Sequence, residues 1–147
     1  MTRVVVLDTG PLGMIAHPKK NPAVGAWIRN LVQDGNKVVV PEIADYEVRR
    51  ELLRAKMSKS VKRLDRLKTT LYYLPLTTPA MIKAAEFWAD ARRRGRPSAD
   101  DKALDGDVIL AAQTSLLVVP GMDTIIATDN VGHLSRYVPA TQWQKIA

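Results

Sequence analysis

The sequence of 147 residues contains no cysteine, which excludes disulfide bonds, thiolate metal sites and a cysteine nucleophile. Aromatic residues make up 5% of the chain, so base stacking on aromatic side chains is a minor term in any nucleic-acid binding. No apolar run approaches the ~20 residues of a membrane span, and the first residues lack the pattern of a signal peptide. We therefore expect a soluble, cytoplasmic protein without a membrane partner.

The charge of the chain is strongly one-sided. Lys and Arg number 22 against 15 Asp and Glu, which gives a formal net charge of +7 and a pI near 9.9. A positive field attracts polyanions such as nucleic acids whatever the fold. The same charge also suits a solvated surface that only keeps the protein in solution. With 46% hydrophobic residues, a chain of this length predicts one folded domain over residues 1–147.

Short apolar runs alternate along the chain with longer stretches of helical period. This alternation predicts a three-layer α/β/α fold with a mainly parallel sheet of four or five strands. The expected strands lie at 4–7, 37–41, 72–76 and 124–128, with a short fifth near Val138 or Trp143. The expected helices cover 21–35, 41–70 as one helix or a helical hairpin, and 77–95, and a further helix follows Asp105 as its N-cap.

Four acidic residues occur where these elements meet. Asp8 ends the first strand and Asp129 ends the last long one, and the carboxyl ends of parallel strands line the crevice where ligands bind in open sheets. Glu47 lies near the start of the helix after the second strand, and Asp107 in the first turn of the helix before the last long strand. Both helices are expected to begin at the same edge of the sheet, so the four carboxylates are expected to face one region.

Each acid also has a plain structural explanation. Asp8 and Asp129 suit Asx-type turns. Asp107 suits a first-turn acid at a helix dipole, and Glu47 suits an exposed ion pair. Together, however, carboxylates repel one another and raise their own pKa values, so an acidic crevice in a positively charged protein calls for a cation. Oxygen ligands without cysteine or clustered histidine favour Mg²⁺ or Mn²⁺ over zinc.

Four segments, VVVLDTGPLG, VVVPEIADYEVRRELLR, DGDVILAAQ and IIATDNVGHL, resemble in this order the acidic motifs of PIN-domain proteins. The set is most similar to VapC-like toxin ribonucleases of bacterial toxin–antitoxin modules, and the resemblance covers nearly the whole chain. It implies a parallel sheet flanked by helices and a divalent-metal-dependent endoribonuclease. It also implies a homodimer that is inhibited by a bound antitoxin protein.

Carried over by position, the resemblance makes Asp8, Asp107 and Asp129 metal ligands and makes Glu47 a ligand that acts directly or through water. It implies supporting roles for three polar neighbours of these acids, Thr9, Thr128 and Asn130. We expect hydrolysis of RNA phosphodiester bonds by a water that one or two divalent ions activate, so no side chain has to act as the nucleophile.

The register of two acidic motifs stays open. Glu42 and Glu51 flank Glu47, and Asp105 precedes Asp107 by two residues. Residues two apart point to different faces of a helix, so Asp105 and Asp107 are not both ligands in the same way. The role of His133, which follows a glycine near the last acidic motif, also stays open between substrate contact and packing.

Basic residues crowd two helical regions. The candidates for contact with RNA or with a partner protein are Arg49, Arg50, Arg54, Arg93 and Arg94. Such runs are equally typical of solvated helix faces.

Two other functions compete with RNA cleavage. A phosphatase is disfavoured, because the motif DTG lacks a second acid two residues after Asp8. A catalytically silent RNA-binding or partner-binding module of the same fold remains the alternative.

Overall fold

The computed structural model describes residues 2–17, 19–95 and 101–147, with only the backbone of residues 101–104. The elements in chain order are β1 (Arg3–Leu7), α1 (Thr9–Ile15), α2 (Pro22–Gln33), β2 (Lys37–Pro41), α3 (Glu42–Arg54), α4 (Ser58–Thr70), β3 (Tyr72–Leu74), α5 (Thr78–Arg93), α6 (Asp101–Leu116), β4 (Asp123–Thr128), α7 (Val131–Leu134), β5 (Ala140–Gln142) and the 3₁₀ turn η1 (Trp143–Lys145). Among the described residues, no helix has the length and apolar character needed to cross a membrane.

The described part of the chain forms one sheet of five parallel strands in the order β3-β2-β1-β4-β5. The chain runs outward from β1 to β2 and β3, and then returns to place β4 and β5 on the other side of β1. The strand order therefore reverses between β1 and β4, and such a switch point opens a crevice beyond the carboxyl ends of the strands. Leu7 pairs with Ala127, so Asp8 and Thr128 leave the sheet side by side at this point.

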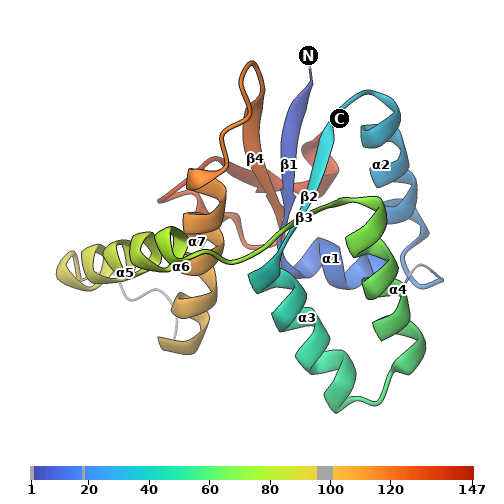
Figure 1. Cartoon of the computed structure of the whole chain (residues 1–147), viewed down its shortest axis with the longest axis horizontal. Coiled ribbons are helices and arrows are strands. Elements are labelled where there is room, and N and C mark those ends of the chain that lie inside the picture. The colour runs from blue at the N-terminus through green and yellow to red at the C-terminus, as the bar shows by residue number, and fades with distance from the viewer. Residues whose placement is uncertain (1, 18, 96–100) are drawn as a thin grey trace.

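Helices cover both faces of the sheet because successive strand residues point to opposite sides. Val5 and Leu7 of β1 join a buried cluster with residues of α1, α2, α3 and α4. Val4 and Val6 join a second cluster with residues of α6 and α7. In Figure 1, α2 and α4 accordingly lie on one side of the sheet and α6 and α7 on the other, with α5 packed against α6.

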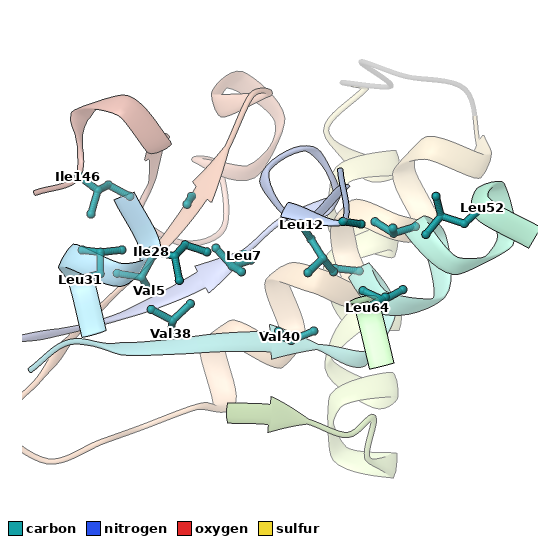
Figure 2. Close-up of a cluster of buried hydrophobic side chains, with 14 residues drawn as sticks. Val5, Leu7, Leu12, Ile28, Leu31, Val38, Val40, Leu52, Leu64 and Ile146 are labelled. Atoms are coloured by element: carbon teal, nitrogen blue, oxygen red, sulfur yellow. The ribbon is translucent and has the colours of Figure 1, made fainter. Parts of the chain in front are cut away.

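Figure 2 shows the first of these clusters, which fixes the elements around the switch point. Leu12 of α1 and Leu64 of α4 are fully buried together with Val5 and Leu7. Burial of each such side chain stabilises the fold by about 1.5–3 kcal/mol. Because α1 starts two residues after β1, this packing also holds the backbone around Asp8 in place.

The predicted α/β fold class, with a parallel sheet between helices, is confirmed. The predicted helical range 41–70 is a hairpin of α3 and α4, and the short fifth strand lies at 140–142, between the two positions expected for it. The third strand is shorter than predicted, because it ends at Leu74 before Pro75.

The predicted start of one helix is wrong. The helix α6 begins at Asp101, so Asp105 is not its N-cap and Asp107 does not lie in its first turn. Ala103 and Leu104 are strong helix formers, and they allow the helix to start earlier than the apolar pattern suggested.

The helix α1 was not predicted, because Gly10, Pro11 and Gly13 make the segment a weak helix former. It forms nonetheless, since the Asp8 side chain accepts a hydrogen bond from the backbone N–H of Thr9 at 2.7 Å and caps the helix. The short helix α7 was missed as well.

Candidate active site

Asp8 lies just beyond the carboxyl end of β1, at the switch point of the sheet, in the region that we call the acidic crevice. One carboxylate oxygen, Oδ1, accepts from the backbone N–H of Thr9, and the other, Oδ2, accepts from the Thr128 hydroxyl at 2.7 Å. Thr128 Oγ1 in turn accepts from the backbone N–H of Asn130 at 2.8 Å. Thr9 at the start of α1 and Thr128 at the end of β4 therefore both donate to the Asp8 carboxylate. Their supporting role in a functional site stays a prediction.

Glu47 reaches the same region from helix α3. Its Oε1 accepts from the Thr9 hydroxyl at 3.0 Å, so Thr9 links the acid of α3 to the residue next to Asp8. The other oxygen, Oε2, lies against the backbone of Gly106 in α6, where an added Cβ would approach it to 2.7 Å. The missing side chain of residue 106 thus leaves room for Glu47 Oε2 in its present position between α1 and α6.

Asp107 follows Gly106 on α6 and is largely buried, with 19% of its side chain exposed. Its Oδ2 lies 3.3 Å from Nδ1 of His133 on α7. Asp105, two residues earlier, is exposed and lines a groove with Met81 and Trp88 of α5. The structure therefore turns Asp107, and not Asp105, toward the other acids.

Asp129 completes the group from the end of β4. It is exposed, and its carboxylate occupies the space next to Gly10, where a Cβ would overlap its Oδ2 and lie 3.2 Å from its Cγ. Gly10 and Gly106 therefore serve the same purpose, since each lets an acidic side chain approach a helix backbone closely.

The charges of these acids act on one another. Burial raises the pKa of Asp8, and the charge of Asp129 raises it further, against the lowering effect of the hydrogen bonds from Thr128 and Thr9. Burial likewise raises the pKa values of Glu47 and Asp107, and the charge of Asp8 adds to the rise in both. The four predicted site residues thus lie close enough around Asp8 to form one electrostatic group.

The donor set suits a hard divalent cation, since it consists of carboxylate oxygens, and a cation would lower the raised pKa values of Asp8, Glu47 and Asp107 again. Among the described residues, however, no three His, Asp or Glu side chains are spaced to hold one ion as they stand. The carboxylates would have to move closer together on binding. The four acids therefore match Mg²⁺ or Mn²⁺ in their charge and in the type of their donor atoms, but not in their present spacing.

The remaining acids near Glu47 have partners of their own. Glu42 Oε1 accepts from the backbone N–H of Leu76 at 2.6 Å, and Glu51 forms an exposed ion pair with Arg54 at 2.9 Å. Their contacts explain why Glu47, rather than either neighbour, faces the crevice.

Most of the expected RNA-contacting arginines have acidic partners within the chain. Arg49 pairs with Asp45 and Asp65, Arg54 pairs with Glu51, and Arg94 pairs with Asp90. Arg50 lies 4.0 Å from Glu47 Oε2, and Arg93 is exposed. Their contact with RNA or with a partner protein stays a prediction.

Sequence reasoning did not find the two glycines or the contact between His133 and Asp107. The signal for Gly106 was present in the motif DGD, because a glycine inside a helix often marks a close approach. The partner of His133 depends on how α7 packs beside α6, which no local pattern encodes.

The fold and the site together define an α/β protein of PIN-like fold with an acidic crevice at the switch point of its sheet. No protein-family model and no curated protein matches the chain. Solved structures do match it over nearly its full length.

The chain is similar to a chain of VapBC-1 from nontypeable Haemophilus influenzae, with 18% identity, a TM-score of 0.66, and coverage of 97% of this chain and 99% of that one. It is similar to a chain of VapBC2 from Rickettsia felis, whose structure contains a promoter DNA fragment, with 14% identity, a TM-score of 0.67, and coverage of 95% and 98%. FitAcB from Neisseria gonorrhoeae gives 22% identity, a TM-score of 0.65, and coverage of 97% and 99%. At these identities the comparison establishes a shared fold.

Proposed function

We propose that the protein is a divalent-metal-dependent endoribonuclease that acts as the toxin of a toxin–antitoxin pair, with residues 1–147 as one nuclease domain. The observation that carries the proposal is the group of acids around Asp8 in a protein of net charge +7, where burial and the charges of neighbouring acids raise the pKa values of Asp8, Glu47 and Asp107. Carboxylates that are largely buried and lie close together cost stability when they ionise, and such groups mark functional sites.

In this proposal, Asp8, Asp107 and Asp129 hold Mg²⁺ or Mn²⁺, and Glu47 ligates directly or through water. When bound, the ion activates a water and offsets negative charge on the scissile phosphate. Thr128 and Thr9 orient the carboxylates of Asp8 and Glu47 through the hydrogen bonds that their hydroxyls donate. His133 keeps Asp107 in position.

The similarity to chains of VapBC and FitAcB structures supports an antitoxin protein as a partner of this chain. We also propose a homodimer in the cytoplasm. The dimer is supported by an apolar surface on α5, where 46% of Met81, 59% of Ile82 and 37% of Trp88 is exposed. Light scattering of the purified protein tests the dimer.

The direct test incubates partner-free protein with RNA in Mg²⁺, in Mn²⁺ and in EDTA. We expect cleavage only with metal, and none by Asp8→Asn at unchanged circular dichroism. Equal cleavage by Asp8→Asn would remove Asp8 from the mechanism.

A catalytically silent RNA-binding or partner-binding module remains the second candidate. It is favoured by the spacing of the acids, of which no three are placed to hold one ion within the described part of the chain. RNA binding without cleavage under both metals would select it.

A further inference from the structure

A second charged cavity lies beside the acidic crevice. It has a volume of about 460 Å³ and lies between the segment that joins α1 to α2 and the turn that joins α3 to α4. Its lining contains five cationic residues and no acid: Lys19, Lys20, Lys56, Lys59 and Arg63. His17, Met57 and two serines complete it. We call this cavity the basic pocket.

The cations of the basic pocket have no acidic counterpart. None of them forms an ion pair with another described residue, in contrast to Arg49, Arg54 and Arg94. Like charges gathered without a counter-ion repel one another, so the pocket gains from an anion as the acidic crevice gains from a cation.

The start of helix α4 adds to the positive potential of the pocket. Ser58, Lys59 and Ser60 form its first turn, which contains no acidic residue, and Met57 at the N-cap provides no side-chain hydrogen bond. The free N–H groups and the dipole of a helix of this length favour a negative charge at its N-terminus.

The two walls of the pocket are held in place. On one wall, the N–H groups of Lys20 and Asn21 both donate to the carbonyl oxygen of His17, at 3.1 and 3.2 Å. On the other, Met57 N–H donates to the carbonyl of Leu52 at 2.9 Å, behind Lys56 with its φ of 57°. Ser60, 3% exposed, joins the walls through a 3.3 Å contact of its hydroxyl with Nδ1 of His17. An anion therefore meets a pocket that needs little rearrangement.

The basic pocket continues toward the acidic crevice. His17 lines both this pocket and a neighbouring groove of about 390 Å³. That groove includes Thr9, Gly10 and Glu47 of the acidic site, and Glu51, which pairs with Arg54, also lines it. A strand that follows this path passes from a phosphate-binding region to the acids.

We propose that the basic pocket binds backbone phosphates of an RNA strand that runs along this groove to the acidic crevice. The continuation of the strand to the acids rests on the proposed RNA cleavage, whereas phosphate binding in the pocket does not. Contact with the phosphates of a single strand suits the basic pocket, because its lining offers five cations and no Phe, Tyr or Trp on which a base could stack.

The test compares Lys20→Gln/Lys59→Gln, which removes one charge from each wall, with Lys62→Gln/Lys145→Gln, which removes two exposed charges outside the pocket. Binding of a labelled RNA of about 12 nucleotides is measured in EDTA over a series of salt concentrations. We expect the pocket variant to bind roughly tenfold more weakly, and its salt slope to fall by about 1.4, since each contacted phosphate of a single strand contributes about 0.7. The variant Lys20→Arg/Lys59→Arg is expected to keep both the affinity for RNA and the salt slope of the natural protein.

Equal effects of the two Gln double variants on the slope would overturn the proposal, because any surface charge would then suffice. If the pocket variant lost binding to a polyglutamate peptide but bound RNA as the natural protein does, the proposal would also be overturned, in favour of an acidic protein partner. In cleavage assays, we expect the pocket variant to raise KM at unchanged kcat. A reduced salt slope in a protein that cleaves no RNA would support the pocket and contradict the proposed cleavage.

Discussion

Two acids of helix α3, Asp45 and Glu47, have their negative charges balanced in different ways. Asp45, 5% exposed, is held by Arg49, with Nη2 to Oδ1 at 3.0 Å and Nε to Oδ2 at 3.3 Å. Glu47, two residues later, has its nearest cation at 4.0 Å, on the exposed Arg50. Asp45 is neutralised inside the fold, whereas Glu47 faces a crevice with other acids.

The difference separates a structural acid from a candidate functional one. Arg49 also bonds Asp65 of α4 at 2.7 Å, so the Asp45 contact ties the helical hairpin together. Glu47 instead has its pKa raised by burial and by the charges of Asp8 and Asp107. An acid whose nearest cation is an exposed arginine at 4.0 Å is available to a cation from solution.

The largest expected effect is a difference in cleavage rate between variants of two acids of α6, Asp107 and Asp105. Asp107→Asn should lower metal-dependent RNA cleavage by on the order of 1000-fold, because loss even of a group that only orients a ligand costs 10–100-fold. Asp105→Asn should leave the rate unchanged, since Asp105 is exposed in a groove with α5 residues. Steady-state rates on one RNA check both, and equal losses would mean that the structure does not distinguish the two acids.

The next effect concerns stability. Arg49→Met leaves Asp45 buried without its partner and should cost roughly 3 kcal/mol of the free energy of unfolding, as does removal of one member of a buried ion pair. Arg50→Met, at an exposed position, should cost no more than about 0.5 kcal/mol. Urea unfolding measures both, and similar values would contradict the distinction between the two acids of α3.

A smaller effect on cleavage is expected when the space that Gly106 leaves for the Glu47 side chain is filled. Gly106→Ala places a Cβ 2.7 Å from Glu47 Oε2, at the end of a flexible side chain that is able to move aside. We expect a loss of cleavage of about tenfold with a melting temperature no lower than that of the natural protein, because alanine favours the helix.

The matched control is Gly25→Ala in α2, where the nearest atom, Arg29 Nη1, would be 3.4 Å from the new Cβ. It should raise stability by about 0.5–1 kcal/mol and leave cleavage unchanged. Loss of activity in the control would show that helix rigidity, and not the position of Glu47, controls the rate.

The smallest effect is a pH dependence. Because the pKa of Glu47 is raised above its ordinary 4.5 in the folded protein, ionisation of this group destabilises the fold at pH values above the raised pKa, and the penalty disappears below pH 4.5. Without metal, Glu47→Gln should therefore raise the melting temperature at pH 7 by about 2 °C, with little change at pH 4. An equal gain at both pH values would contradict a raised pKa.

Much of the fold follows from the sequence. The apolar runs around Val5, Val39 and Ile126 predict the central strands, because strands covered on both faces are continuously apolar. The helix α1 could not be predicted, since tertiary packing of Leu12 and the cap at Asp8 override the weak propensity of its glycines.

The sequence also places the acids at one edge of the sheet, because the ends of parallel strands share an edge. It does not determine how close they come. The distances around Glu47 depend on the missing side chain of Gly106, and the pairing of Arg49 with Asp65 depends on the hairpin turn. The basic pocket likewise joins residues of two loops, Lys20 and Lys56 among them, that no local pattern connects.

Calorimetric titration of the RNA-free protein with Mn²⁺ tests the central claim most directly. The natural protein should bind the ion with a measurable heat and gain thermal stability that rises with the concentration of free ion, while Asp8→Asn should show neither. Absence of binding by the natural protein, or an equal response of Asp8→Asn, would contradict the claim that the acids around Asp8 form a site for a divalent cation.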